Sequence, residues 1–224
     1  MNIAESVKRK TEDYSHYLKT EPFNAQLQAG KLTAESYANF LFSIEYLIKH
    51  TPIHLRLAIE TSIEHPELAE YFRHKFDEEQ GHDQWAIDDR AKLEPLINPP
   101  ERVSGQESMR FYPQVSLEMW DYVREIERMI RADPRIYISY IYYTEYLTVL
   151  VADKMKAGLS RCGFGDEPVE VLTKHAELDV HHTSEGIEAI EQFLPETTDM
   201  RAAVEKQIDA FIKLHIAMFK ACLV

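Results

Sequence analysis

The stretch from residue 136 to residue 152 constrains the fold of this chain more than any other. Its 17 residues include five tyrosines, and Glu145 is the only charged side chain among them. On a helix, such a stretch is apolar or aromatic nearly all round, and a helix without a polar face has to be buried. It is too short and too polar for a membrane span, which needs about 20 predominantly apolar residues. We therefore expect a central helix that other helices cover.

The rest of the chain shows the spacing of amphipathic helices. From Thr33 the apolar residues recur at steps of three and four, and Pro52 suggests a kink or a restart. A second long helix is expected from Pro66. No alternating run of strand length competes and no linker divides the chain, so the sequence predicts an all-α fold and a single domain, residues 1–224. Further helices are expected at about 114–131, 134–160, 167–194 and 198–222, with shorter helical turns near 3–18 and 22–28.

The charge and the cysteines narrow the class of function. The formal net charge is −13, with 25 Lys and Arg against 38 Asp and Glu. An acidic chain lacks the basic surface that binds phosphates or anionic lipid, so we expect no nucleic acid and no membrane as partner, and a small molecule as substrate. The two cysteines, Cys162 and Cys222, cannot form a disulfide framework, and residues 1–10 show no apolar signal segment. Both observations predict a cytoplasmic protein.

Polar residues on the inward stripes are the candidates for a functional site. In the helix expected from Pro66, Glu79 and His82 fall close to the apolar stripe that starts at Leu68, taking about 100° per residue. Glu78 points about 100° away from Glu79, so Glu79 is the preferred inward residue and Glu78 the alternative. The E-x-x-H spacing lets both side chains reach one metal ion. Alone it is a weak signal, because Glu and His also occur at this spacing on surface helices.

Glu145 is the second candidate. An ionised carboxylate in a buried helix costs several kcal/mol, roughly, unless a cation, a metal ion or hydrogen-bond donors meet it, or unless it stays protonated. The alternative to a functional site is a carboxylate that accepts hydrogen bonds from Tyr142, Tyr143 or Tyr146. Because a charge is rarely placed in a core without a function, we favour the functional interpretation.

The strongest signal is the segment His175-x-x-x-Asp179-x-x-His182. At helical spacing its three side chains cover only about 60° of the circumference, beside an inward apolar stripe. Two imidazoles and one carboxylate suit a first-row transition metal. His181 points elsewhere and is expected to face solvent.

Glu45 lies at the margin of the apolar stripe of the first long helix, where most carboxylates are solvated. With it, the candidates are four carboxylates and three imidazoles from four helices, enough for two metal ions. Such mixed oxygen and nitrogen ligands favour iron or manganese, whereas structural zinc more often recruits thiolates. The predicted metal ligands are Glu45, Glu79, His82, Glu145, His175, Asp179 and His182.

These residues resemble one known group of proteins, the haem-oxygenase-like dimetal oxidases. That superfamily shares a bundle of seven to eight helices with haem oxygenase, TenA-type thiaminase II and the PqqC cofactor-synthesis enzyme, and members often carry TenA or Thi-4 labels. The likeness covers most of the chain. It is carried by Glu21-Pro22-Phe23 to Gly30-Lys31-Leu32-Thr33, Tyr37-x-x-Phe40, Asp77-Glu78-Glu79-Gln80-Gly81-His82 and the His175 to His182 segment.

The resemblance implies a fold, a cofactor and an activity. It implies two irons, with manganese as an alternative, held by the seven residues named above. It also implies that Glu145 or Glu79 bridges the ions as a catalytic carboxylate. The implied activity is an oxidase or oxygenase that uses O2 as co-substrate to oxidise a small organic molecule. A homodimer is expected from the resemblance alone.

Two other interpretations stay open. One is a metal-free TenA-like hydrolase or binding protein, in which the same seven polar residues bind a thiamin-type heterocycle. TenA enzymes use a cysteine nucleophile on the core helix, and this chain has no cysteine before Cys162, which makes that hydrolysis doubtful. The other is a helical protein whose buried polar groups only satisfy one another. A metal site has to lose its ion when His175 or Asp179 is replaced by Ala.

Overall fold

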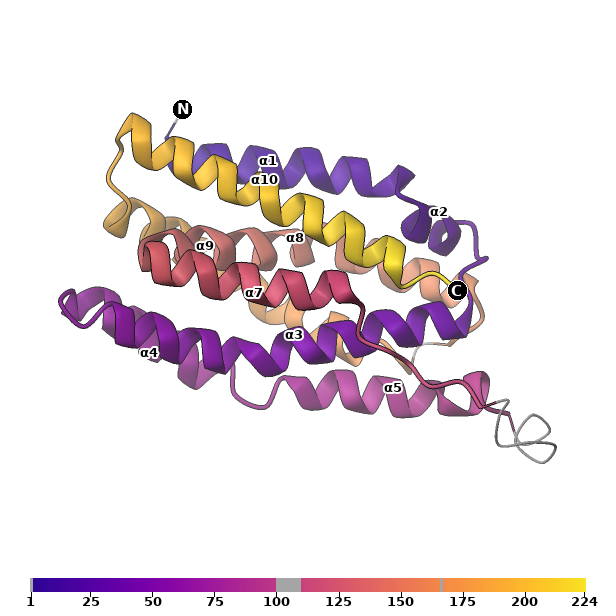
Figure 1. Cartoon of the computed structure of the whole chain (residues 1–224). Helices are drawn as coiled ribbons and strands as arrows, with labels where there is room; N and C mark the ends of the chain where they lie inside the picture. Colours follow the sequence, from indigo (N-terminus) through magenta and orange to yellow (C-terminus); the bar gives the residue numbers. More distant parts are fainter. Residues whose placement is uncertain (1, 100–109, 166) are drawn as a thin grey trace.

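The computed structural model describes residues 2–99, 110–165 and 167–224, and in these ranges it contains helices and no strand. This confirms the predicted all-α fold class. Long helices lie side by side along one common direction (Figure 1). The helices are α1 (Ile3–Tyr17), α2 (Pro22–Gln28), α3 (Ala34–Thr61), α4 (Pro66–Glu78), α5 (Asp83–Ile97), α7 (Leu117–Ala132), α8 (Pro134–Arg161), α9 (Glu170–Phe193) and α10 (Thr198–Ala221), with a 3-10 turn at Leu18–Thr20.

Helix α8 holds the 136–152 stretch and lies in the middle of the bundle. It contacts α1, α2, α7, α9 and α10. No residue of the stretch is exposed, and Tyr137, Tyr142 and Tyr143 are among the largest fully buried side chains. Helix α3 packs against α4, α5 and α7 on the other side of the bundle. The expected buried core helix is therefore confirmed. No helix in the described part of the chain is long and apolar enough to cross a membrane.

Side-chain caps explain where several helices begin. The first amides of a helix have no acceptor within the helix, so an oxygen just before it stabilises the end by about 1 kcal/mol. Here the cap is a Ser, Thr, Asn or Asp whose oxygen accepts from a first-turn amide. These residues are Asn2 before α1, Thr33 before α3, Ser116 before α7, Asp133 before α8 and Thr197 before α10.

One expected element is divided. The second long helix, expected from Pro66 and expected to carry Glu79 and His82, ends at Glu78, and a new helix begins at Asp83. The cause is Gly81, which has a φ of 83°, a left-handed conformation that a right-handed helix cannot include. Glu79 is the C-cap of α4 and His82 precedes α5. The predicted ligand pair therefore lies on a turn between two helices. By contrast, α3 continues through Pro52.

Candidate metal centre

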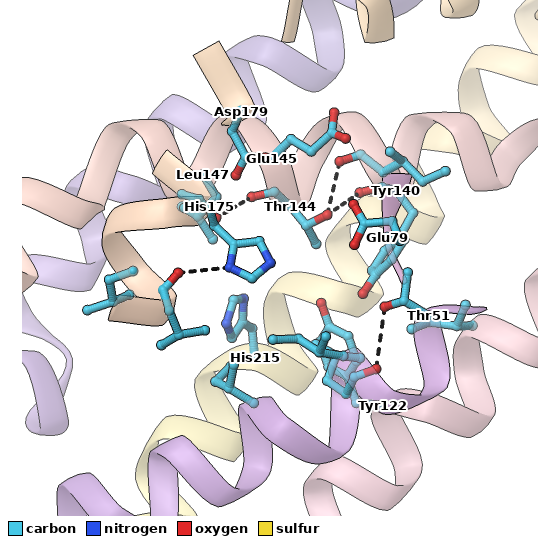
Figure 2. A pocket seen from close by; sticks show the side chains of 18 of the residues that line it. Thr51, Glu79, Tyr122, Tyr140, Thr144, Glu145, Leu147, His175, Asp179 and His215 are labelled. Atoms are coloured by element: carbon cyan, nitrogen blue, oxygen red, sulfur yellow. Dashed lines mark hydrogen bonds between the residues drawn. The ribbon is translucent and has the colours of Figure 1, made fainter. Parts of the chain in front are cut away.

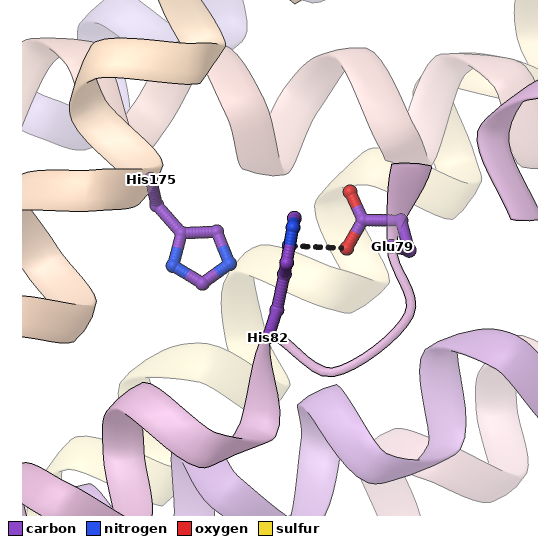
Figure 3. Close-up of side chains that lie close together, drawn as sticks. All are labelled: Glu79, His82 and His175. Atoms are coloured by element: carbon purple, nitrogen blue, oxygen red, sulfur yellow. Dashed lines mark ion pairs between the residues drawn. The ribbon is translucent and has the colours of Figure 1, made fainter. Parts of the chain in front are cut away.

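The turn between α4 and α5 brings Glu79 and His82 together in spite of the helix break. His82 Nδ1 lies 3.3 Å from Glu79 Oε2. His175 approaches from α9, and its ring meets that of His82 edge to face with the centroids 5.3 Å apart. One ligand atom from each of these three residues lies within 4.8 Å of the other two (Figure 3). Glu79, His82 and His175 form what we call the first ligand group.

Helices α8 and α9 supply a second ligand group next to the first. Its members are Glu79, Glu145 and His182, whose ligand atoms also lie within 4.8 Å of one another. His182 Nδ1 lies 3.5 Å from Glu145 Oε1 and 3.5 Å from Asp179 Oδ1. Asp179 is buried beside His182, although it is not a member of a three-ligand group. Glu79 belongs to both groups, which is the position that a bridging carboxylate needs.

Buried atoms without hydrogen bonds concentrate at these groups. Among the described residues, His82 Nδ1, His182 Nδ1, Glu145 Oε2 and Glu78 Oε2 are buried side-chain atoms without a hydrogen-bond partner. His82 Nδ1, His182 Nδ1 and Glu78 Oε2 have ion-pair contacts of 3.2–3.8 Å but no hydrogen bond. Buried polar atoms are normally hydrogen-bonded, so this group of exceptions requires an explanation. All four are nitrogen or oxygen atoms of the kinds that bind iron and manganese. The donor set therefore fits the metal centre that the resemblance implies.

The ring of His175 is held in an orientation suited to metal binding. Its Nδ1 lies 2.8 Å from the backbone oxygen of Val171 on the same helix (Figure 2). Because a carbonyl oxygen only accepts, Nδ1 carries the hydrogen. The lone pair of the neutral ring is then on Nε2, the tautomer that a metal-binding histidine uses.

A buried carboxylate positions the start of α9. Asp89 on α5 is fully buried and accepts hydrogen bonds from the amides of Glu170 and Val171 at 2.9 and 2.8 Å. These are the first two amides of the helix, where a negative charge is also favoured by the helix dipole. Asp89 thus holds α9, which carries His175 and His182, against α5.

Burial and neighbouring charges shift the pKa values within the centre. Burial raises the pKa of Glu145 to about 8, against the opposing effect of the Lys75 ammonium. Burial also raises the pKa of Asp179. For Glu79 burial acts upward as well, but His82, His175 and Lys75 together outweigh it, and the pKa is lowered. The pKa of His182 is raised, chiefly by Asp179. Such opposed shifts are typical of functional sites.

A cavity of about 200 Å³ adjoins the centre. Glu79, Glu145, His175 and Asp179 line it (Figure 2). The remaining wall comes mainly from α3, α7, α8 and α10 and is mostly apolar and aromatic. It includes Phe40, Ile44, Leu47, Ile48, Leu55, Tyr122, Ile126, Tyr137, Tyr140 and Leu147. A mostly apolar pocket with a few convergent polar groups is the usual form of a small-molecule site.

Two contacts differ from those considered from the sequence. Glu45 is buried and belongs to neither ligand group; its oxygens form ion pairs with Lys49 and Arg90 at 2.6 and 2.7 Å. The tyrosines do not satisfy Glu145 either. The hydroxyl of Tyr143 contacts His215 Nδ1 at 3.2 Å, and that of Tyr146 donates to Glu12 at 2.7 Å.

Sequence reasoning missed Lys75. Its side chain is 2% exposed, and its ammonium lies 3.2 Å from Glu78, 3.4 Å from Glu145 and 3.4 Å from Glu185. A signal was present, because Lys75 falls about 20° from Leu68 around the helix, on the edge of the apolar stripe of α4. Glu78 was named only as the alternative to Glu79, and the structure turns both toward the centre, Glu78 toward Lys75 and His182.

Two solved structures show the same fold as this chain. One is a domain of unknown function with a haem oxygenase-like fold from Shewanella denitrificans OS217. It is 17% identical, covers 96% of this chain and 89% of its own, and superposes with a TM-score of 0.79. The other is a TenA homolog from Pseudomonas syringae pv. tomato strain DC3000. It is 11% identical, covers 98% and 92% of the two chains, and has a TM-score of 0.69. These likenesses confirm the predicted haem-oxygenase-like bundle.

The sequence comparisons assign the family. Among curated proteins, none matches this sequence. The model of a family described as iron-containing redox enzyme matches residues 46–215 of the 224. The match includes six of the seven predicted ligands, from Glu79 to His182, and leaves Glu45 one residue outside. The chain therefore belongs to this family of iron-containing redox enzymes, which share the haem-oxygenase-like fold.

Proposed function

We propose that this protein is a non-haem diiron oxidase that uses O2 to oxidise a small organic substrate. The observation that carries the proposal is the convergence of carboxylates and imidazoles where α8, α9 and the Glu79 turn meet, with several of their buried nitrogen and oxygen atoms not hydrogen-bonded. The family match to iron-containing redox enzymes supports iron over other metals. Manganese remains the second choice, since the ligand types suit both.

Each group of residues has a task in this proposal. Glu79, His82 and His175 would hold one ion, and Glu145, Asp179 and His182 the other, with Glu79 shared between them. Two ferrous ions, when bound, supply the electrons that activate dioxygen. The hydrogen bond from His175 to the Val171 oxygen keeps the ring in one orientation, so the site is arranged before the metal arrives.

The cavity gives the substrate its place beside the centre. Its apolar wall excludes water and accepts the hydrophobic body of a small molecule, while Glu79 and Glu145 line the same cavity as the centre. We propose these two carboxylates as the catalytic ones.

The test is metal content followed by oxygen exposure. The protein is loaded with Fe(II) without oxygen, the bound iron is measured by elemental mass spectrometry, and the visible spectrum is followed after O2 is added. We expect two irons per chain and a transient absorption band. His182→Ala should lose iron and the band. His181→Ala is the matched control, because it removes an exposed histidine next to His182 on the same helix. A chain that binds no stoichiometric metal under any loading condition would refute the proposal.

A metal-free, TenA-like hydrolase or binding protein is the second candidate. The fold shared with a TenA homolog and the tyrosine-lined cavity favour it. Neither of the two cysteines of the chain, Cys162 and Cys222, lines the cavity, so a cysteine nucleophile there is not supported. This candidate predicts that thiamin-type heterocycles bind the metal-free protein. It also predicts that His175→Ala weakens their binding by no more than the loss of one polar contact would.

A further inference from the structure

Lys75 is a charged side chain that the proposed function does not use. It lies on α4, one turn before Glu79, and its ammonium has three carboxylate neighbours within 3.4 Å, from Glu78, Glu145 and Glu185. A lysine is almost never fully buried unless its charge is paired. The three carboxylates supply that pairing.

The carboxylates that bind Lys75 are also the candidate ligands of a second ion. Glu145 belongs to the second ligand group, and Glu78 and Glu185 form a further group of possible metal ligands with His182. The ammonium contacts the Oε1 atom of Glu145 and the Oε2 atoms of Glu78 and Glu185. An ammonium group and a divalent ion within a few ångströms repel one another strongly in a buried site. They therefore compete for the same carboxylates.

The first ligand group has no direct contact with the ammonium, which acts on Glu79 only through its charge. Within the described part of the chain, none of Glu79, His82 and His175 forms an ion pair with Lys75. The position of the ammonium is thus asymmetric with respect to the two groups. The carboxylates around the ammonium also differ in exposure. The side chain of Glu185 is 47% exposed and that of Glu145 only 8%, so the ammonium can move toward solvent on the Glu185 side.

We propose that the Lys75 ammonium occupies the second ligand group as long as no metal ion is bound there. The two metal ions then bind in a fixed order. The first ion binds Glu79, His82 and His175 while the ammonium stays on Glu145. The second ion binds only when it displaces the ammonium from Glu145 toward Glu78 and the exposed Glu185. This inference rests on the proposed dimetal function.

The test is a titration with Mn(II), in which the free ion is counted by its electron paramagnetic resonance signal. Wild-type protein should bind one ion tightly and a second ion more weakly. In Lys75→Met, an unbranched and uncharged replacement, the second ion should bind about tenfold more tightly. The first ion should gain much less, because Lys75 forms an ion pair with Glu145 and none with Glu79, His82 or His175. Lys49→Met is the matched control. It removes a lysine from an ion pair with Glu45 that belongs to neither ligand group, and both steps should stay as in the wild type.

The outcomes separate the two proposals. If Lys75→Met and the wild type bind the second ion equally, the inference about Lys75 is wrong and the dimetal function stands. If neither protein binds Mn(II) or Fe(II), the dimetal function fails and the inference fails with it. If the wild type binds two ions of equal affinity, ordered loading is refuted directly.

A measurement on the wild-type protein covers the case in which Lys75→Met does not fold. Amines are acetylated with an N-hydroxysuccinimide ester during the Mn(II) titration, and each lysine is followed by peptide mass spectrometry. We expect Lys75 to be protected without metal and with one ion, and to be modified faster once the second ion binds. Lys49, with a half-exposed side chain, reports the reactivity of the reagent throughout. Unchanged protection of Lys75 with two ions bound would contradict the displacement.

Discussion

His54 makes a quantitative prediction about acid stability. It lies on α3, is 1% exposed, and its Nε2 has no hydrogen-bond partner among the described residues. Burial, helped by the neighbouring His50, lowers the pKa of His54 to about 3 from an ordinary value of 6.5. Between these values the unfolded chain binds a proton at this residue that the folded chain does not bind. The free energy of unfolding therefore falls as the pH drops below 6.5, and the loss continues down to the folded pKa.

The size of the effect follows from the two pKa values. Between about pH 7.5 and about pH 5, this single group should remove about 2 kcal/mol of stability from the wild type. His54→Leu abolishes the titration, so the variant should lose about 2 kcal/mol less than the wild type over the same interval. Urea denaturation at both pH values measures it, provided that unfolding is reversible and two-state. His16→Leu, which removes an exposed histidine from α1, is the control. Equal losses in wild type and His54→Leu would refute the reasoning.

Three further predictions concern α9 and the metal centre. Gly186→Ala should lower the free energy of unfolding by about 1 kcal/mol net in urea denaturation, because a Cβ would lie 3.0 Å from the ring and 3.2 Å from the Cβ of buried Tyr142, and this overpacking outweighs the gain in helix propensity. Asp89→Ala should lower the free energy of unfolding by about 2 kcal/mol in the same assay, because the first two amides of α9 lose their acceptor. It should also weaken metal binding. An unchanged metal affinity would show that α9 keeps its position without Asp89. Fe(II) at about 100 times its dissociation constant should raise the free energy of unfolding by about 2.7 kcal/mol per site, and His175→Ala should reduce the shift in thermal melting.

Helical periodicity explains what could be predicted from the sequence. His175, Asp179 and His182 were expected on one face of a continuous helix, and α9 runs unbroken through all three. The buried position of Glu145 followed in the same way from a helix without a polar face. In both cases the direction of a side chain depends only on its position along one regular element.

Contacts between helices set the limit of such reasoning. The buried Glu45 could be recognised as a carboxylate near an apolar stripe, but its partner Arg90 comes from α5, and only the packing of α3 on α5 brings the two together. Lys75 is a similar case. Its place on the stripe could have been read from the sequence, whereas its partners on α8 and α9 depend on the tertiary structure.

The turn at Gly81 shows a prediction that succeeded for a different reason. Glu79 and His82 were placed together by assuming one helix, and the structure places them together by ending it. A glycine inside a helical pattern is tolerated at a cost of about 1 kcal/mol, so its presence did not require a break. The left-handed conformation of Gly81 is visible only in the structure.

The position of this pair on a turn has a consequence for how related sequences are recognised. Along α9, one inserted residue between His175 and Asp179 would rotate one side chain by about 100° away from the other, so that spacing has to be conserved. Between Glu79 and His82 an insertion would only lengthen a loop, at a small entropic cost, and both residues would still flank the same two helix ends. A search pattern with a fixed E-x-x-H spacing would therefore miss any relative that has the same centre and a longer turn, whereas a pattern that lets this gap vary and holds the α9 segment fixed would find it.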